Sequence, residues 1–597
     1  MLKRFFLNSL SAFVGAWVAL MLAIVCCFLF FFAIVGKMAQ FTGSPNVEQV
    51  KKGSILKLSL DGEIVETDNP TEPDITQLVR GEFDMPQTLD VIVQGLKEGA
   101  ENKNISALYI ECGALAASPA TLNAVRHAVL DFKKSGKKVY AYGDALTMGA
   151  YFVASAADRV YLNPSGMLQM NGLGSMSMYL KGLMDKLGIQ FQVVKVGTYK
   201  SAVEPYIMEN MSEPARAQLD TLFTNMWGYI KDQISASRKG VTPALIDSLV
   251  SQKSITFAPT TLAVQSGLVD SLIYGREINS RLALLCDRDP DELNFVSPQT
   301  LCGGSAWETN YRGKNQIAIL YACGEIIDGT GKGIDFEKLV PIIVKLADDE
   351  NVKGMVLRVN SPGGSAFGSD QIGEALDYFQ KKGKPLAVSM GDYAASGGYW
   401  ISCGANRIFA DPLTITGSIG IFGLIPNVSG LTEKIGVNPQ LVATNPGAQF
   451  PNMLKPLDEH QLAVMQAYVD RGYEQFTERV AKGRKMKLDK VLAIAEGRVW
   501  DAFKAKQLGL VDTLAYLDDA IEWTARQCKI DGNYDLSVYP EVEPNFWSLI
   551  RQQSGQMKEM AAKIAAPDVN QVMIEYARSL IRREKVQARM PMVKVTL

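Results

Sequence analysis

An internal repeat constrains the fold of this 597-residue chain more than any other feature of its sequence. A shift of 248 positions aligns two sets of residues, Gly143, Asp144, Gly149, Tyr151, Ala157, Arg159 and Pro164 with Gly391, Asp392, Gly397, Tyr399, Ala405, Arg407 and Pro412. Each copy later contains Gly-Leu-Val-Asp, at 267–270 and at 509–512. Self-similarity at a fixed spacing is the signature of a duplicated structural unit, so we expect two similarly folded halves.

The two copies differ at two positions that bear on chemistry. Ser396 of the second copy aligns with Met148 of the first, and Lys200 of the first copy aligns with Ala448 of the second. A serine and a lysine can act together as nucleophile and base. Each copy therefore contributes one member of a potential serine/lysine pair.

Short apolar runs alternate with helical patterns in both copies. The runs at 105–110 and 352–359 are typical of buried strands, and the stretches at 121–134 and 370–382 are typical of amphipathic helices. Strands that alternate with helices predict βαβ units around a largely parallel sheet, which places the chain in the α/β class. Because domains usually hold about 100–200 residues, several domains are expected.

The predicted organisation has five parts. They are an N-terminal transmembrane anchor at 1–40, a first repeat at 41–287, a linker at 288–313, a second repeat at 314–540 and a C-terminal helical extension at 541–597. Within the extension, residues 572–589 are typical of a basic amphipathic helix. Such a helix fits an anionic membrane surface, a neighbouring subunit or an ordinary solvated position, and the sequence leaves these interpretations open.

The anchor is predicted from residues 12–36, which include no charged side chain. A bilayer core of about 30 Å needs roughly 20 apolar residues in a helix. A cleaved signal peptide is the alternative, but its apolar region has about 7–15 residues and ends in small ones, whereas residues 28–32 are bulky. Lys3 and Arg4 precede the span and favour a cytoplasmic N-terminus. Residues beyond about 40 would then lie outside the cytoplasm.

Charge and composition exclude several function classes. The 61 basic and 63 acidic residues leave a net charge of −2, so no basic field is available to attract nucleic acid. The cysteines lack a CxxC spacing, which gives no support to a zinc site, and we expect no metal or cofactor. A disulfide between Cys286 and Cys302 and a set of buried free thiols both remain open.

Histidine chemistry has little support. The sequence has only two histidines, His127 in a predicted helix and His460 in Asp-Glu-His-Gln, and neither lies near a plausible nucleophile. A Ser-His-Asp mechanism needs a histidine beside the serine. We therefore expect both histidines to be structural or solvated.

A lysine base must be neutral, and this condition requires burial. With an ordinary pKa of about 10.4, a lysine that is neutral at pH 7 costs about 4–5 kcal/mol, which desolvation must provide. Lys200 follows an apolar, strand-like run at 191–196, so a loop there can turn its side chain inward. The competing interpretation is an ordinary exposed lysine.

Ser396 lies in Gly-Asp-Tyr-Ala-Ala-Ser-Gly-Gly-Tyr-Trp, whose small residues allow a strand-to-helix turn. Such a turn exposes the hydroxyl and frees backbone N–H groups. Upstream, Val-Asn-Ser-Pro-Gly-Gly-Ser at 359–365 follows a buried strand and can present an N–H to a developing oxyanion, whereas the first copy lacks the glycine pair. A purely structural glycine turn is the alternative.

These motifs resemble the signal peptide peptidase A family, also called protease IV, of the Clp protease/crotonase superfamily. The resemblance extends over residues 50–530 and is strongest to the long, duplicated bacterial form, whose two motifs stand intact at 197–202 and 395–399. The fold it implies is a pair of tandem crotonase/Clp-like ββα-superhelix repeats after the N-terminal transmembrane helix. The first repeat would contribute the catalytic lysine and the second the nucleophilic serine.

The resemblance also implies a role for each site residue. Ser396 would be the nucleophile, Lys200 the general base, and Ser418 the serine that hydrogen-bonds the lysine and orients it. The N–H groups of Gly364 and Gly397 would form the oxyanion hole.

The biological setting implied by the resemblance is a homotetramer in the bacterial inner membrane, with its catalytic part on the periplasmic side. Its substrates would be cleaved signal peptides and other unfolded hydrophobic peptides, and the protein would be a serine endopeptidase. Two alternatives are a noncatalytic membrane scaffold that captures hydrophobic peptides and a crotonase-type acyl-CoA enzyme.

Overall fold

The structure is a computed structural model that describes residues 50–67, 87–251, 255–303, 306–307, 309–329, 331, 333–541 and 586–589. The predicted membrane anchor lies outside these residues, as do positions 572–585 of the predicted basic helix. Within the part of the chain that the structure describes, no helix has both the length and the apolar character needed to cross a bilayer.

The first half builds a seven-stranded parallel sheet in the order β2-β1-β3-β4-β5-β7, with β8 added beside β1. The strands are β1 (Ser54–Val65), β2 (Gln87–Thr88), β3 (Ile105–Ala116), β4 (Lys138–Leu146), β5 (Arg159–Leu168), β7 (Ser271–Leu272) and β8 (Phe295–Val296). Side chains alternate between the two faces of a strand. Accordingly, Leu56 and Leu58 of β1 belong to one hydrophobic core and Ile55 to another. Both faces of the sheet are therefore covered, as parallel sheets require.

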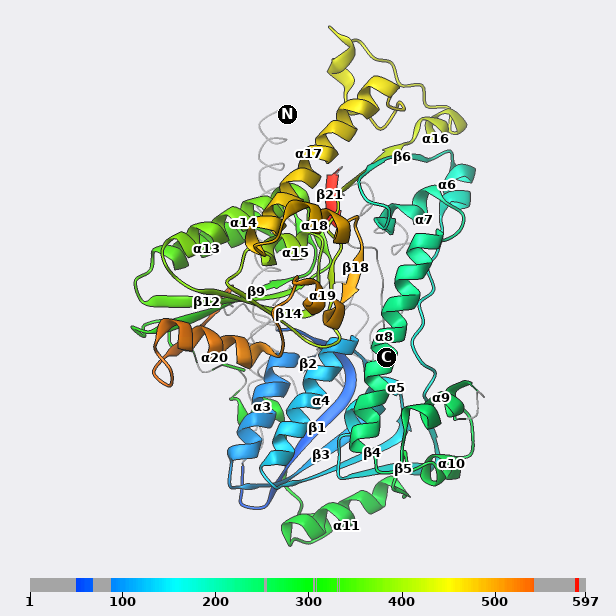
Figure 1. Cartoon of the computed structure of the whole chain (residues 1–597). Coiled ribbons are helices and arrows are strands. Elements are labelled where there is room, and N and C mark those ends of the chain that lie inside the picture. The colour runs from blue at the N-terminus through cyan, green and yellow to red at the C-terminus, as the bar shows by residue number, and fades with distance from the viewer. Residues whose placement is uncertain are drawn as a thin grey trace, which may run out of the picture. The chain divides into compact units, whose positions relative to one another are not determined.

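Helices α3 and α4 cover one face of this sheet and α11 covers the other (Figure 1). Helix α4 begins at Pro119, whose missing N–H costs nothing at the first helical position, and ends before Gly136, which has a φ of 84°. The helices of this half are α3 (Leu89–Glu101), α4 (Pro119–Lys134), α5 (Met148–Ala154), α6 (Lys181–Leu187), α7 (Glu204–Ile207), α8 (Glu213–Ser237), α9 (Pro243–Ser251), α10 (Thr260–Gln265), α11 (Gly275–Cys286) and α12 (Pro298–Leu301).

The second half builds an eight-stranded sheet in the order β18-β16-β14-β12-β9-β20, and β15 pairs with β14 and β19. Only the pairing of β16 with β18 is antiparallel among the pairings described for this sheet. The strands are β9 (Gln316–Cys323), β12 (Val352–Ser361), β14 (Leu386–Ala395), β15 (Arg407–Ala410), β16 (Ile415–Gly417), β18 (Val499–Asp501), β19 (Thr513–Leu514) and β20 (Asp535–Tyr539).

Helices α13 and α14 pack on one face of the second sheet and α20 on the opposite face (Figure 1). The helices of this half are α13 (Phe336–Asp348), α14 (Ala366–Lys381), α15 (Gly397–Ser402), α16 (Ser429–Lys434), α17 (Glu459–Gly483), α18 (Leu488–Ile494), α19 (Ala502–Leu508) and α20 (Leu517–Cys528). Strand β14 begins 248 residues after β4, the same shift that aligns the two copies in sequence. The predicted α/β class and the alternation of strands and helices are confirmed.

A third, six-stranded sheet combines strands from both halves in the order β11-β10-β13-β21-β17-β6. Its strands are β6 (Gln190–Lys195), β10 (Ile326–Ile327), β11 (Ile334–Asp335), β13 (Gly363–Ser365), β17 (Phe422–Asn427) and β21 (Val586–Arg589). Strand β6 of the first half pairs antiparallel with β17 of the second along its whole length. This pairing brings the segment after β6, which includes Lys200, against the second half.

Buried polar contacts also join the halves. Thr121 of α4 donates its N–H and its hydroxyl to the carboxylate of Asp392, at 2.9 and 2.8 Å. Glu66, which follows β1, forms a buried ion pair with Arg358 of β12, with a nitrogen-to-oxygen distance of 2.8 Å. Because Asp392 belongs to β14 and lies four residues before Ser396, its contact with Thr121 holds the strand that leads to the predicted nucleophile.

Two segments differ from their sequence-based description. The predicted linker at 288–313 includes β8 and α12, and β8 pairs with β1. The predicted helix at 572–589 is wrong at its last four residues, which form β21. An extended segment there pairs with two sheet strands at once, and tertiary pairing of this kind overrides helix propensity. The domain bounds themselves stay a prediction.

The cysteines of the described chain are free thiols. They are Cys112, Cys286, Cys302, Cys323, Cys403 and Cys528. The disulfide between Cys286 and Cys302 that the sequence left open is therefore not formed in this structure.

Candidate active site

Ser396 lies at a sharp turn between a strand and a helix. Strand β14 ends at Ala395 and α15 begins at Gly397, so the predicted strand-to-helix turn is present. The backbone of Ser396 has φ 57° and ψ −117°, which non-glycine residues rarely adopt. Its N–H donates to the carbonyl of Gly417 at 2.8 Å. Strained turns of this kind are concentrated at functional sites, where they fix the direction of a reactive side chain.

Lys200 approaches Ser396 from the first half. Its Nζ lies 2.7 Å from the Oγ of Ser396. The same nitrogen lies 3.0 Å from the carbonyl oxygen of Ser418 and 3.1 Å from its Oγ. All three residues are completely buried. The structure thus brings together three of the five predicted site residues. Along the chain, Lys200 is 196 residues from Ser396 and 218 residues from Ser418.

The surroundings of Lys200 favour its neutral form. Desolvation by burial lowers the pKa of Lys200 well below its ordinary value of 10.5. The partners of its Nζ are hydroxyl and carbonyl oxygens. A neutral amine has a lone pair that can accept the proton of a hydroxyl, so this lysine can act as a base towards Ser396.

Ser418 occupies a second strained turn, between β16 and β17. Its φ is 51°, and its N–H donates to the carbonyl of Arg498 at 2.7 Å. Its hydroxyl also donates to the carbonyl of Gly497 at 3.4 Å. Because its backbone is held in place, Ser418 can fix the position of the Lys200 amine through two oxygen atoms.

The loop that holds Lys200 rests on a turn of the second half that the sequence did not single out. The carboxylate of Glu496 accepts from the N–H of Thr198 at 2.9 Å and from its hydroxyl at 2.7 Å. Gly497 has a φ of 72°, and a Cβ there would lie 2.7 Å from the Cβ of Lys200. The available sequence signal was again a difference between copies, since the shift of 242 that aligns the nearby Gly-Leu-Val-Asp motifs places Ile255 opposite Gly497.

The two predicted oxyanion donors belong to neighbouring elements. Gly364 lies in β13 with a φ of 153°, and a Cβ at this position would lie 2.0 Å from the carbonyl oxygen of Ile326, so only glycine fits. Gly397 is the first residue of α15, where a backbone N–H has no intrahelical partner. Gly397 directly follows Ser396, and β13, which includes Gly364, packs against α15. The role of both glycines as oxyanion donors stays a prediction.

The corresponding region of the first half lacks this chemistry. Met148, the counterpart of Ser396, begins α5 and is buried in the core of the first sheet. Ala448, the counterpart of Lys200, is exposed. The described chain therefore has one serine/lysine pair from its two copies, with one member from each.

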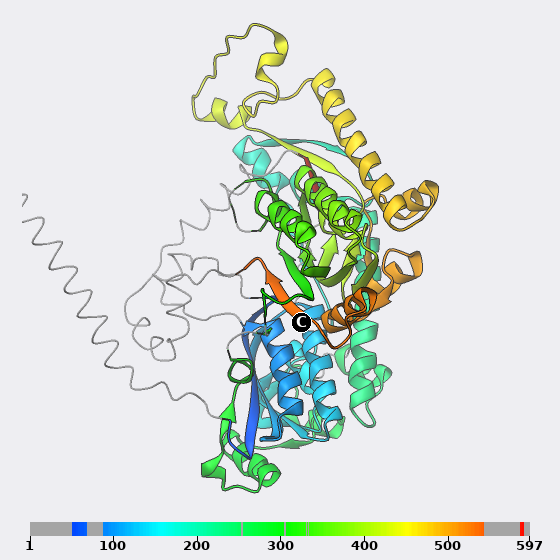
Figure 2. The same cartoon turned by 90° about the vertical axis from the view of Figure 1, so that its left-hand side faces the viewer.

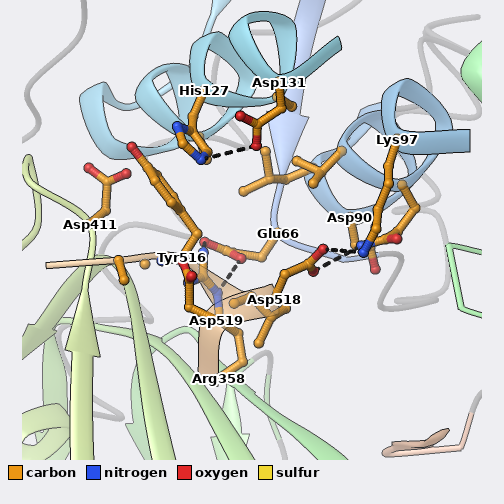
Figure 3. Close-up of a pocket in the computed structure, with 18 of the residues that line it drawn as sticks. Glu66, Asp90, Lys97, His127, Asp131, Arg358, Asp411, Tyr516, Asp518 and Asp519 are labelled. Carbon is orange, nitrogen blue, oxygen red and sulfur yellow. Dashed lines mark hydrogen bonds and ion pairs between the residues drawn. The ribbon is translucent and has the colours of Figure 1, made fainter. Parts of the chain in front are cut away.

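A separate cavity of about 380 Å³ lies between the two halves (Figure 3). Helix α4 contributes His127 and Asp131, and α20 contributes Asp518. The ring of His127 stacks on Tyr516 with 4.0 Å between centroids, its Nε2 lies 3.2 Å from Asp131, and burial lowers its pKa. Neither member of the serine/lysine pair lines this cavity.

Known proteins resemble both halves of the chain. The model of peptidase family S49 matches residues 131–287 and 378–531. Protease 4 of Haemophilus influenzae is 33% identical over 83% of this chain and 82% of its own length. Protease 4 of Salmonella typhi is 33% identical over 90% of this chain and 88% of its own length. A putative signal peptide peptidase SppA of Enterococcus faecium is 38% identical over 31% of this chain and 54% of its own length.

These matches extend over both copies of the repeat and over most of the length of two relatives. They agree with the long, duplicated form that the sequence motifs indicated. The chain belongs to peptidase family S49, and it is a serine protease.

Proposed function

We propose that this protease uses Ser396 as its nucleophile and Lys200 as its general base. The observation that carries the proposal is the 2.7 Å distance between Lys200 Nζ and Ser396 Oγ, in a pair that is completely buried. Burial lowers the pKa of the amine and favours the neutral form, which can accept a proton, and Ser418 orients it.

Acylation follows from this geometry. The Oγ of Ser396 attacks the carbonyl carbon of the scissile peptide bond while Lys200 accepts the hydroxyl proton. The N–H groups of Gly364 and Gly397 stabilise the negative charge that develops on the carbonyl oxygen. The C–N bond then breaks, and the leaving amine takes the proton from Lys200, which returns the lysine to its neutral form.

Deacylation repeats these steps with water. Lys200 accepts a proton from a water molecule that attacks the ester carbonyl of the acyl-serine. The C–O bond to Ser396 then breaks, and the serine oxygen recovers the proton from Lys200. The products are a carboxylic acid and the free enzyme, so the base is unchanged at the end of each turnover.

The proposed substrates are cleaved signal peptides and other unfolded hydrophobic peptides. The name of the Enterococcus faecium relative and the sequence motifs support this choice. We further propose two ββα-superhelix repeats of the Clp/crotonase type, which assemble as a homotetramer that excludes folded proteins. The uncharged stretch at 12–36 supports an anchor in the bacterial inner membrane, with the catalytic part on the periplasmic side.

The test is hydrolysis of a fluorogenic hydrophobic peptide by the purified full-length chain. We expect Ser396→Ala to abolish hydrolysis. Ser402→Ala is the matched control, because Ser402 is also buried and donates its hydroxyl only to the carbonyl of Gly398, at 2.6 Å, among the described contacts. Equal hydrolysis by Ser396→Ala and the unchanged protein would reject this nucleophile. Capture of peptides without hydrolysis would support a scaffold, and tight acyl-CoA binding would support a crotonase-type enzyme.

A further inference from the structure

The cavity between the two halves is a separate space from the proposed catalytic centre, and we call it the inter-half cavity (Figure 3). Helices α3 and α4 of the first half and α20 of the second line it, and α20 lies next to them in both overall views (Figures 1 and 2). Cavities that bind small molecules usually have volumes of about 300–1,000 Å³. The volume of about 380 Å³ therefore suits a small ligand.

The walls of the inter-half cavity combine apolar and acidic side chains. Alanines of α3 and α4 and several aromatic rings supply the apolar surface. Among the described residues that line the cavity, eight are aspartate or glutamate, and two, Lys97 and Arg358, are lysine or arginine. Both cations are already paired within the wall, Lys97 with Asp518 at 2.9 Å and Arg358 with Glu66 at 2.8 Å. The wall therefore has a surplus of negative charge.

Two carboxylates of the cavity have only neutral donors among the described contacts. Asp411 is 4% exposed and accepts from the side-chain amide of Asn123, at 2.9 and 3.1 Å, and from the N–H of Leu413, at 2.7 Å. Asp90 accepts from the hydroxyl of Tyr321 at 3.4 Å and from the next backbone N–H at 2.8 Å. Burial raises the pKa of both carboxyl groups, to about 7 for Asp411. A cation beside them would favour their charged forms, so both positions can stabilise a positively charged ligand.

The carboxylates of the cavity lie at different depths. Asp411 is almost fully buried, whereas the side chain of Asp131 on α4 is 46% exposed and that of Asp518 on α20 is 31% exposed. In Figure 3 these three side chains come from different sides of the space. A flexible molecule with several separated positive charges can pair with carboxylates at both depths. Hydrocarbon segments between its charges would suit the apolar walls.

We propose that the inter-half cavity binds a linear polyamine, a chain of protonated amines joined by methylene segments. One ammonium group pairs with the buried carboxylate of Asp411, and another pairs with Asp131 at the rim. The methylene segments pack on the alanines, and the aromatic rings of Trp307 and Tyr516 attract ammonium groups that lie over their faces. Because Asp131 belongs to the first half and Asp411 to the second, the bound ligand stabilises the junction between them.

The test is isothermal titration calorimetry of spermine with the purified full-length chain at constant ionic strength. We expect saturable binding that is about tenfold weaker in Asp411→Asn and in Asp131→Asn, because each variant removes one charge-assisted hydrogen bond. The matched control is Asp232→Asn on α8, which removes an exposed carboxylate outside the cavity and should leave the affinity unchanged. Circular dichroism verifies the fold of each variant. If Asp411→Asn does not fold, Asp131→Asn decides the test, because its side chain is half-exposed.

Three results would overturn the proposal. They are the absence of saturable spermine binding, equal affinities in Asp131→Asn and Asp232→Asn, and displacement of spermine by equimolar magnesium chloride. The last result would assign the cavity to metal ions, whereas a polyamine site should retain spermine.

A second measurement compares the affinity for spermine at pH 6 and pH 7.5. The charged and titratable groups that face Asp411 are Asp392, Arg358, Tyr229 and Tyr516. With a pKa of about 7, Asp411 is ionised in about a tenth of the molecules at pH 6 and in about three-quarters at pH 7.5. Loss of a proton from His127, which also lines the cavity, favours a cation in the same direction. We therefore expect binding to be about eightfold tighter at pH 7.5, and Asp411→Asn to lose most of this difference. Equal affinities of the unchanged protein at the two pH values would overturn the role of Asp411.

Discussion

At the scale of single residues, the proposed mechanism depends on the burial of Lys200, which favours its neutral form. Lys200 is completely buried, and desolvation lowers its pKa well below the ordinary value. The sequence could predict Ser396 and Lys200, because each stands in a distinctive motif and is absent from the other copy. It could not predict the roles of Glu496 and Gly497, because their contacts with the lysine loop join positions about 300 residues apart.

We predict that Lys200→Met lowers kcat by at least about 10³-fold, because methionine retains an apolar stem and removes the proton acceptor. The measurement is steady-state hydrolysis of a hydrophobic peptide, with circular dichroism to verify the fold. Residual hydrolysis of more than a few per cent, with the pH profile of the unchanged enzyme, would contradict the base assignment.

Lys200 also links stability to pH. Its pKa is lower in the folded state than in the unfolded state, so the unfolded state binds more protons between the two values. Stability contributed by this position therefore rises with pH, by up to about 1.4 kcal/mol per pH unit, until the pH exceeds the unfolded pKa of about 10.4.

The corresponding prediction compares free energies of unfolding, measured by chemical denaturation from pH 7 to pH 10, for the unchanged chain and for Lys200→Met. The unchanged chain should gain stability relative to the variant as the pH rises. Parallel pH dependences for the two proteins would show that Lys200 is not held neutral by the fold.

At the scale of elements, the repeat makes much of the fold predictable. Strand β14 begins 248 residues after β4, and α20 begins 242 residues after α11. The two halves therefore repeat the same elements, and the separation between equivalent elements is six residues shorter near the end of the repeat. The third sheet could not be predicted from the sequence. Its strands are short, they come from distant parts of the chain, and β21 lies in a segment whose pattern favours a helix.

The turn that supports the lysine loop gives an element-scale prediction. Gly497→Ala should lower kcat about 10²-fold, because its Cβ would lie 2.7 Å from the Cβ of Lys200 and displace the amine from Ser396. Gly436→Ala is the matched control. Gly436 has a similar φ of 74°, but a Cβ there meets nothing within 4 Å. Comparable losses of kcat in both variants would show that backbone strain, rather than the position of Lys200, is responsible.

At the scale of the whole molecule, the proposed active site is divided between the two halves of the duplicated chain. The serine and the strands around it come from the second half, and the proposed base comes from the first. Activity therefore depends on how firmly the halves are joined. The buried pair of Glu66 and Arg358 and the contact between Thr121 and Asp392 are two of the polar contacts at that junction.

We predict that Glu66→Ala destabilises the chain by about 3–5 kcal/mol, because it leaves the charge of Arg358 buried with less compensation. The control is Lys97→Ala. The ion pair of Lys97 with Asp518 also joins the halves but is largely exposed, so its loss should cost less than about 1 kcal/mol. Chemical denaturation measures both values. Similar small losses would mean that the buried pair does not hold the halves together.

The most direct test of the divided active site is covalent trapping by a hydrophobic peptidyl phosphonate that reacts with activated serines. Peptide mapping by mass spectrometry should find the adduct on Ser396 in the unchanged protein and should find none in Lys200→Met, because the hydroxyl is no longer activated. An adduct on another residue, or one that forms on Ser396 at an undiminished rate in Lys200→Met, would contradict the account.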